Sequence, residues 1–127
     1  MQYPSDRKYS AEHEWVTLTG DEARVGITDY AQDALGDVVF VQLPDVGLEV
    51  VANASCAEVE STKSVSEIYS PVSGKITAVN ATLTDQPERL NQDPYGEGWI
   101  FTLQITDPGE LDALLDAAAY QHLVENA

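Results

Sequence analysis

Two short alternating segments on either side of four polar residues place the strongest constraint on the fold. Residues 57–60 read Ala-Glu-Val-Glu, the period-two pattern of a half-buried strand, and residues 65–69 alternate in the same way. The Ser-Thr-Lys-Ser stretch at 61–64 is short enough to form the tip of a β-hairpin. The pattern therefore predicts a hairpin that carries Lys63 into solvent on a rigid two-stranded base.

Lys63 differs from an ordinary surface lysine in its surroundings. Most surface lysines are only solvated, but this chain has three lysines, Lys8, Lys63 and Lys75, against 22 acidic residues. Serine and threonine on both sides of Lys63 leave room for a second protein to reach its amine. An exposed lysine on a regular backbone is what a modifying enzyme requires, and this stretch supplies one.

The N-terminal half predicts two strands, a helix and a third strand. The first two strands flank a turn at Gly20-Asp21. A helix begins at Thr28, whose hydroxyl can cap it, and ends at Gly36, where a residue without Cβ can turn left-handed. Residues 38–43 are apolar on both faces, so we expect this strand to be covered on both sides and to lie at the centre of the core.

The C-terminal half predicts a core strand followed by a helix. Trp99, Phe101 and Leu103 share one wholly apolar face, which we expect to pack in the core. Asp107, followed by proline and then glutamate, has the pattern of a helix start. The helix would pack an apolar stripe on the sheet, made of Leu111, Leu114, Leu115 and Ala118.

A faint internal repeat brackets the predicted hairpin. A Pro-x-x-Gly turn at 44–47 precedes the apolar residues 48–51, and a second one at 71–74 precedes the strand pattern of 75–79. Each turn would direct the chain into a strand. The hairpin is therefore expected to lie between two structurally similar segments.

The length and charge of the chain limit its domain organisation and the kinds of partner it can bind. With 127 residues and 43% apolar content, the chain is expected to form a single domain over residues 1–127. Its formal charge of −16 argues against nucleic acid and anionic membranes, and favours partners with basic docking surfaces. No apolar run approaches a membrane span and no signal peptide is recognisable, so the expected location is cytoplasmic.

The sequence shows no pattern typical of catalysis. The single cysteine, Cys56, excludes an internal disulfide and is expected to be a small residue in a strand. His13 and His122 are the two histidines and belong to no set of spaced metal ligands. A nucleophile–base pair and a glycine-rich phosphate loop are both missing from the sequence. A non-catalytic protein is therefore expected.

Several blocks of the sequence resemble the H proteins of the glycine cleavage system. Residues 59–64, together with 70–74, are similar to the hairpin on which that family carries its lipoyl group. Further similar blocks follow in order over nearly the whole chain: His13–Val16, Gly26–Gln32, Leu35–Asp37, Leu43–Pro44, Asn80 and Asn91–Trp99. The resemblance implies a mainly β, lipoyl/biotinyl-carrier-like sandwich of two antiparallel sheets (a barrel-sandwich hybrid) with a few short helices, including a C-terminal one. The repeated turns fit the quasi-symmetric halves of that fold.

The resemblance also implies a function for Lys63. This residue would carry covalently attached lipoic acid, installed by a lipoate-attaching enzyme, and the protein would be a carrier, not an enzyme. The carrier would take the aminomethyl group from the pyridoxal-phosphate-dependent glycine decarboxylase (P protein) to the tetrahydrofolate-dependent aminomethyltransferase (T protein). It would pass reducing equivalents to dihydrolipoyl dehydrogenase (L protein). The expected oligomeric state is a monomer.

Two carboxylates are expected to shelter the loaded arm. The resemblance points to Glu14, in the segment 13–15, and to Glu67 as groups that would pair with the ammonium of the loaded arm and slow its loss to water. Glu12 departs from the small hydroxyl residue often found at its position in the family. The alternative is that Glu14 and Glu67 are ordinary surface acids.

Four other functions remain open at this point. A biotin carrier places methionines beside its lysine, whereas Thr62 and Ser64 flank Lys63 and the only methionine is Met1. Lipoyl domains of 2-oxoacid dehydrogenases usually show Asp-Lys-Ala at the tip. An H-like relay protein could serve lipoate transfer or another pathway without glycine cleavage. The fourth alternative is a binding module that carries no group at all.

Overall fold

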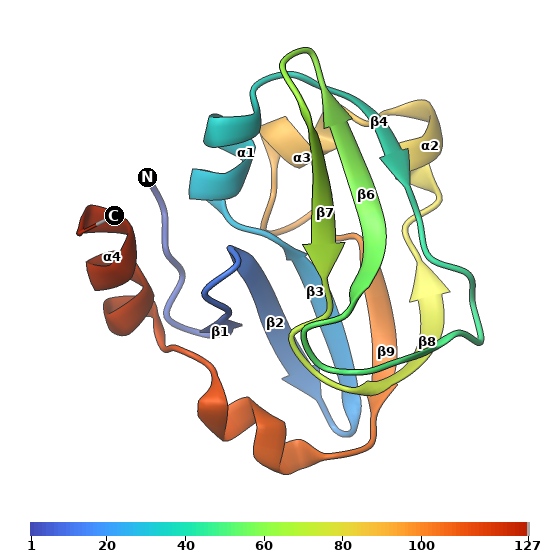
Figure 1. Cartoon of the computed structure of the whole chain (residues 1–127), viewed down its shortest axis with the longest axis vertical. Helices are drawn as coiled ribbons and strands as arrows, with labels where there is room; N and C mark the ends of the chain where they lie inside the picture. Colours follow the sequence, from blue (N-terminus) through green and yellow to red (C-terminus); the bar gives the residue numbers. More distant parts are fainter. Residues whose placement is uncertain (127) are drawn as a thin grey trace.

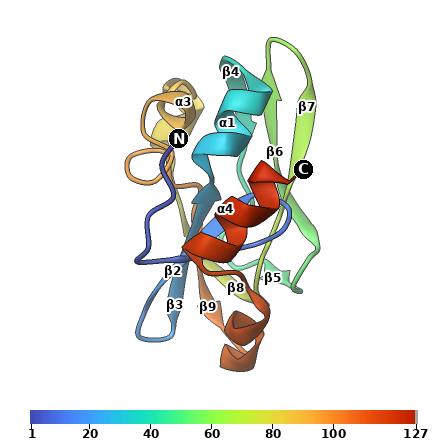
Figure 2. The same cartoon turned by 90° about the vertical axis from the view of Figure 1, so that its left-hand side faces the viewer.

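The computed structural model describes residues 1–126 as two antiparallel sheets with short helices at their margins (Figures 1 and 2). One sheet has the order β1 (Lys8–Tyr9), β2 (Glu14–Thr19), β3 (Glu22–Ile27), β9 (Phe101–Ile105), β8 (Gly74–Val79) and β5 (Glu49–Val50). The other has the order β4 (Val38–Gln42), β6 (Ser55–Ser61) and β7 (Val65–Tyr69). The helices are α1 (Asp29–Leu35), α2 (Thr82–Asp85), α3 (Arg89–Gln92), the 3-10 helix η1 (Pro108–Ala113) and α4 (Ala117–Glu125). The predicted mainly β sandwich is confirmed.

The hydrophobic core lies between the two sheets. The six-stranded sheet contributes Val25, Ile76, Phe101 and Leu103, all at most 1% exposed. The three-stranded sheet contributes Val41, Val59 and Ile68 to the same cluster. Burial of this apolar surface is the main force that holds the sheets together. The expectation that Phe101 and Leu103 face the core is confirmed.

The predicted hairpin is formed by β6 and β7. These strands pair antiparallel, with Glu60 opposite Val65, and the chain turns through residues 61–64. The strands that follow the two Pro-x-x-Gly turns, β5 and β8, pair with each other in the larger sheet, with Glu49 opposite Lys75. Cys56 is a half-buried residue of β6, and burial raises the pKa of its thiol to about 12.

Helix α1 begins and ends where the sequence predicts. The hydroxyl oxygen of Thr28 accepts a hydrogen bond from the Ala31 amide at 3.2 Å, which satisfies one of the unpaired donors of the first turn. At the other end Gly36 has φ +81°, a conformation that favours glycine. Both predicted signals are local, and both are confirmed.

The strand predicted to lie at the centre of the core is instead an edge strand. β4 pairs only with β6, and a β-bulge between Val38 and Phe40 interrupts the alternation. Val38 and Val41 are buried, whereas Val39 and Phe40 are 52% and 49% exposed. The residues are apolar on both faces, but only one face is covered by the second sheet.

Trp99 does not belong to the core face of β9. The strand begins at Phe101, and Ile100 is the fully buried residue that precedes it. Trp99 is half-buried, and the guanidinium of Arg24 lies 4.4 Å from the centre of its ring. Trp99 packs against a second hydrophobic cluster, made of Tyr9, Trp15 and Tyr120, and not with Phe101 and Leu103 between the sheets. The predicted shared face fails because alternation holds only within a regular strand, and Trp99 closes the preceding loop by donating its amide hydrogen to the Gly96 carbonyl.

The C-terminal region forms two helices, not one continuous helix. Asp107 caps η1 as predicted, accepting a hydrogen bond from the Gly109 amide at 3.1 Å. The backbone of Leu115 then exchanges two 2.8 Å hydrogen bonds with Tyr9, which stops the helix. Asp116 caps α4 by accepting from the Ala119 amide at 2.8 Å. The predicted apolar stripe is therefore broken up: Leu111 lies in η1, Leu114 and Leu115 lie in the connection, and Ala118 lies in α4. Across residues 1–126, no helix has the length and apolarity to cross a membrane.

Candidate functional site

Lys63 is exposed and lies between β6 and β7, at the tip of their hairpin. The hairpin tip is at the top of Figure 1. The hydroxyl oxygen of Ser61 accepts hydrogen bonds from the amides of Lys63 and Ser64, each at 3.1 Å. The Ser61 amide in turn donates to the Ser64 carbonyl at 2.8 Å. One serine thus organises the four-residue tip, and the lysine stands on a defined backbone.

The α1–β4 connection supports the hairpin tip from one side. The Thr62 amide donates to the Asp37 carbonyl at 3.0 Å. The methylene stem of Lys63 lies over Gly36, so closely that a Cβ at position 36 would come within 2.8 Å of the lysine Cε. Neither of the two ion pairs in residues 1–126 involves Lys63. Lys63 is therefore exposed to solvent beside an ordered backbone.

A groove of about 270 Å³ runs between α1 and β7, beside the hairpin tip. We call it the α1–β7 groove; it is lined by Glu12, His13, Ile27, Tyr30, Ala31, Ala34, Leu35, Ser64, Val65, Ser66, Glu67 and Ile68. Its walls combine apolar side chains from α1 with two carboxylates. A surface of this kind can hold an apolar chain that ends in a cation.

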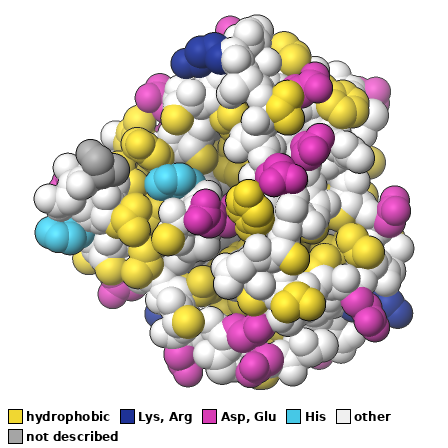
Figure 3. All heavy atoms as spheres, viewed as in Figure 1, with side chains coloured by type: hydrophobic (Ala, Val, Ile, Leu, Met, Phe, Trp, Pro, Cys, Tyr) yellow, Lys and Arg dark blue, Asp and Glu magenta, His cyan; other side chains and the backbone are white. Residues whose placement is uncertain are grey.

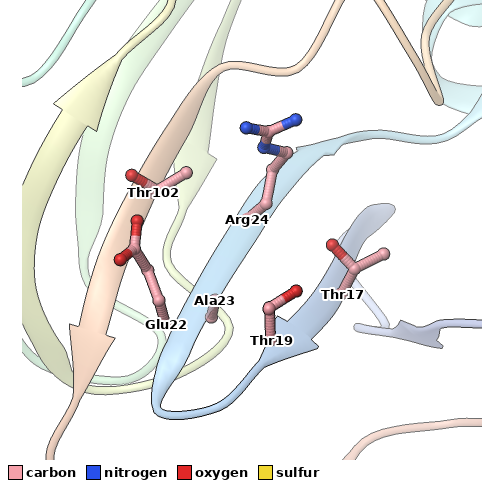
Figure 4. A pocket seen from close by; sticks show the side chains of 6 residues that line it. All are labelled: Thr17, Thr19, Glu22, Ala23, Arg24 and Thr102. Carbon is pink, nitrogen blue, oxygen red and sulfur yellow. The ribbon is translucent and has the colours of Figure 1, made fainter.

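A second hollow, of about 380 Å³, lies on the larger sheet and is shown in Figure 4. It is lined by Thr17, Thr19, Glu22, Ala23, Arg24 and Thr102. None of these residues lines the α1–β7 groove or belongs to the β6–β7 hairpin. This hollow is therefore separate from the candidate site.

Glu67 and Glu14, predicted as partners of one shelter, occupy different environments. Glu67 is exposed on the groove, where its carboxylate accepts a hydrogen bond from the Tyr69 hydroxyl at 3.2 Å. Glu14 is 1% exposed and does not line the groove. Its carboxylate accepts from the Ser10 hydroxyl at 2.6 Å and from the Tyr69 amide at 3.2 Å. Glu14 is thus not an ordinary surface acid but a buried link between the start of β2 and β7.

Burial raises the pKa of Glu14 to about 7 from 4.5, because desolvation outweighs the two hydrogen bonds that favour the charged form. A carboxyl whose folded-state pKa is raised binds more protons when folded, so its contribution to stability is complete below pH 4.5 and lost as the pH rises through 7.

We expect Glu14→Gln to remove this dependence of stability on pH. The difference in free energy of unfolding between variant and wild type should shift steadily in the variant's favour between pH 4.5 and 7.

Urea denaturation at several pH values measures this difference. Glu88→Gln, which removes an exposed carboxylate far from Glu14 in the sequence, is the matched control. Parallel profiles for wild type and Glu14→Gln would show that Glu14 does not titrate in this range.

Two features of the site were not predicted from the sequence. His13, considered only as a metal ligand, lines the groove and has its Nδ1 2.8 Å from the Tyr120 hydroxyl. The position of His13 between Glu12 and Glu14 was the sequence signal that could have identified it as a groove residue.

Within residues 1–126 no group of His, Cys, Asp or Glu side chains could hold a metal ion.

The second feature that the sequence did not predict is an apolar patch on the outer face of the three-stranded sheet. Phe40 lies opposite Glu60, and Glu60 opposite Val65, so these side chains form one row across β4, β6 and β7. Phe40 and Val65 are 49% and 58% exposed. Figure 3 shows hydrophobic and acidic side chains intermingled on this side of the molecule. The sequence indicated apolar residues here but not that solvent faces them.

Known proteins with similar sequences and structures form one group. Residues 7–127 match the family model described as glycine cleavage H-protein. The chain is 56% identical to the glycine cleavage system H protein of Thermus thermophilus over 126 residues, covering 99% of this chain and 98% of that protein. It is 55% identical to the one from Beutenbergia cavernae over 123 residues, with 97% of each chain covered.

A solved structure gives the same result. The crystal structure of a glycine cleavage system H protein from Mycobacterium marinum superposes with a TM-score of 0.89 at 47% identity, covering 96% of this chain and 98% of that one. Sequence and fold therefore agree over nearly the full length. The chain belongs to the glycine cleavage H-protein family.

Proposed function

We propose that this chain is the lipoyl-lysine carrier of a glycine cleavage system, with lipoic acid attached to Nζ of Lys63. The observation that carries this proposal is the exposed Lys63 on an ordered hairpin tip, in a chain of this family. The carrier acts as one domain over residues 1–127, a cytoplasmic monomer without catalytic activity. Its partners are the P, T and L proteins and a lipoate-attaching enzyme.

The chain's own residues position the arm. When attached, the lipoyl group supplies the sulfur atoms that take up the aminomethyl group and reducing equivalents. Ser61 sets the conformation of the tip, and Gly36 gives the lysine stem a surface on which to lie. A tether of this kind raises the effective concentration of its cargo at each enzyme, on the order of millimolar for short flexible links.

Reconstitution tests the proposal directly. The lipoylated chain, combined with the P, T and L proteins, tetrahydrofolate, NAD and ¹³C-labelled glycine, should support release of labelled carbon dioxide and formation of methylene-tetrahydrofolate. The unlipoylated chain is the control and should support neither. A lipoylated chain that supports no turnover would contradict the glycine cleavage role and favour an H-like relay in lipoate transfer.

The outer row of Phe40, Glu60 and Val65 lies close to the lysine and suits docking by these enzymes. Its exposed apolar side chains offer buried contact area, and the acidic side chains favour partners with basic surfaces. Because the whole chain has a charge of −16, encounter should be steered electrostatically.

We therefore expect association rates with the three enzymes to fall as salt is added, since the Debye length shrinks to about 3 Å at 1 M. Phe40→Ser should weaken binding mainly through faster dissociation, because it removes a contact rather than a charge. Stopped-flow association and surface plasmon resonance measure the two effects. Association rates that do not change with salt would remove electrostatic steering from the docking mechanism.

The α1–β7 groove is the surface against which the loaded arm would shelter. Tyr30, Ala31 and Ala34 supply accessible apolar surface, and Glu67 and Glu12 supply carboxylates for the ammonium. Glu14 supports this surface from behind by holding the Tyr69 amide of β7. Its role would therefore be to position β7, not to contact the amine.

Glu67→Ala should speed the spontaneous loss of the aminomethyl group from the loaded protein, by up to about fivefold, as expected for an exposed ion pair. Glu88→Ala removes an exposed carboxylate that lies neither on the groove nor in the outer row, and it is the matched control. The loss is followed as formaldehyde release from the isolated loaded protein. Equal rates in the two variants would exclude Glu67 from the shelter.

A further inference from the structure

A chain of three hydrogen-bonding side chains links the α1–β7 groove to the C-terminal helix. The Tyr120 hydroxyl of α4 lies 2.8 Å from Nδ1 of His13 and 2.7 Å from the hydroxyl of Thr28. Figure 2 shows α4 in front of the N-terminal strands and below α1. Thr28 and Tyr120 are fully buried, whereas His13 is half-buried and lines the groove.

The number of available hydrogens decides the direction of these bonds. The Thr28 oxygen already accepts from the Ala31 amide, and each of the two hydroxyls has one hydrogen to donate. If Thr28 donates to Tyr120 and Tyr120 donates to His13, every hydrogen has an acceptor. If His13 donates from Nδ1, the Thr28 and Tyr120 hydroxyls can form only one bond between them. One of their two buried hydrogens then has no acceptor among these groups, which is unfavourable.

The favoured arrangement defines the state of His13. Its Nδ1 accepts, so the ring is neutral and carries its hydrogen on Nε2. A protonated ring would have hydrogens on both nitrogens and would force the unfavourable arrangement. Burial also lowers the pKa of His13, while Glu12 acts in the opposite direction.

The groups around His13 act in opposite directions on the protonation of its ring. Glu12 is on the same turn and favours an imidazolium, and Glu67 adds a second carboxylate to the same groove from β7. Tyr30 of α1 contributes an aromatic ring, 4.8 Å from the imidazole. The Tyr120 hydroxyl from α4 is the group that opposes protonation by hydrogen bonding.

The backbone holds His13 in place as well. The His13 carbonyl accepts from the Thr28 amide at 3.1 Å, and the His13 amide donates to the Ser10 carbonyl at 3.2 Å. Its φ of +72° is unusual for a residue with a side chain and is maintained by these contacts. The backbone from which the ring projects is therefore fixed beside Thr28.

We propose that Tyr120 is a positioning residue that keeps His13 as the neutral Nε2–H tautomer, so that the α1–β7 groove retains its negative charge for a cationic amine on the lysine arm. The identity of that amine rests on the proposed function, whereas the state of His13 does not. The C-terminal helix thus contributes to the groove without lining it.

Long-range ¹H–¹⁵N spectra of the histidine rings test this in the intact chain. Wild type should show the hydrogen of His13 on Nε2. Tyr120→Phe keeps the ring that stacks on Tyr9 at 4.8 Å but lacks the hydroxyl. We expect its His13 to take up a proton at higher pH, by roughly half to one unit, the equivalent of one hydrogen bond.

Tyr95→Phe is the matched control, because the Tyr95 hydroxyl bonds to Gln2 and Asp29 and has no bond to His13. Its His13 should titrate as in wild type. An Nδ1–H tautomer in wild type would overturn the proposal, and so would equal titration of His13 in wild type and Tyr120→Phe. The wild-type spectrum decides the tautomer even if Tyr120→Phe does not fold.

A second measurement connects the tautomer to the arm. After lipoylation and loading by glycine decarboxylase, the comparison is made at a pH where the ring spectra show His13 protonated in Tyr120→Phe and neutral in wild type. There Tyr120→Phe should lose its aminomethyl group roughly threefold to tenfold faster than wild type, as one lost interaction predicts. Equal loss rates would overturn the role of His13 in the groove. Failure of wild type to be loaded would instead contradict the proposed function, while the ring spectra would still report the tautomer.

Discussion

Replacing Lys63 by arginine should abolish lipoyl attachment and leave the fold unchanged. Arginine keeps the positive charge and most of the stem that lies over Gly36, but its guanidinium does not form the amide that lipoylation requires. The side chain is exposed, so the free energy of unfolding should change by less than about 0.5 kcal/mol. Intact mass after co-expression with a lipoate ligase measures the modification, and wild type should gain one lipoyl group.

Lys75→Arg is the matched control for this experiment. Lys75 is also exposed on a strand, in β8, but it is not at a hairpin tip. This variant should be lipoylated to the same extent as wild type. A lipoyl group on Lys63→Arg would show that attachment occurs at another lysine and would remove the basis of the candidate site.

Trp15→Ala should cause the largest loss of stability among single side-chain deletions, about 3–5 kcal/mol, the usual range for a buried large aromatic residue. Trp15 is 1% exposed, and its indole N–H donates to the Pro94 carbonyl at 2.9 Å. The ring lies against Gly26, where a Cβ would approach within 2.6 Å, and Arg7 lies 4.7 Å from the ring centre. Deletion would leave a cavity that these neighbours cannot fill.

The second tryptophan is the natural comparison. Trp99 is half-buried, at the margin of the aromatic cluster that contains Trp15, and Arg24 lies 4.4 Å from its ring centre, so Trp99→Ala should cost clearly less. Denaturant unfolding with matched m-values measures both losses. Equal losses for the two variants would mean that the aromatic cluster of Tyr9, Trp15 and Tyr120 contributes less than its burial indicates.

The sequence alone determined the features that depend on neighbouring residues. The hairpin and its exposed Lys63 follow from alternation around four polar residues, and α1 follows from the cap at Thr28 and the stop at Gly36. These signals act over a few residues, through strand periodicity and the unpaired groups at helix ends. The pattern therefore specifies them without knowledge of the rest of the fold.

Only the tertiary structure decided what covers each face. Alternation assigns a residue to one face of a strand but does not say whether solvent or a second sheet covers that face. For this reason the sequence did not predict that β4 is an edge strand or that Glu14 is a buried carboxylate. His13 and Tyr120 meet across 107 positions of the chain. Such contacts arise from the packing of whole elements, and no local pattern contains them.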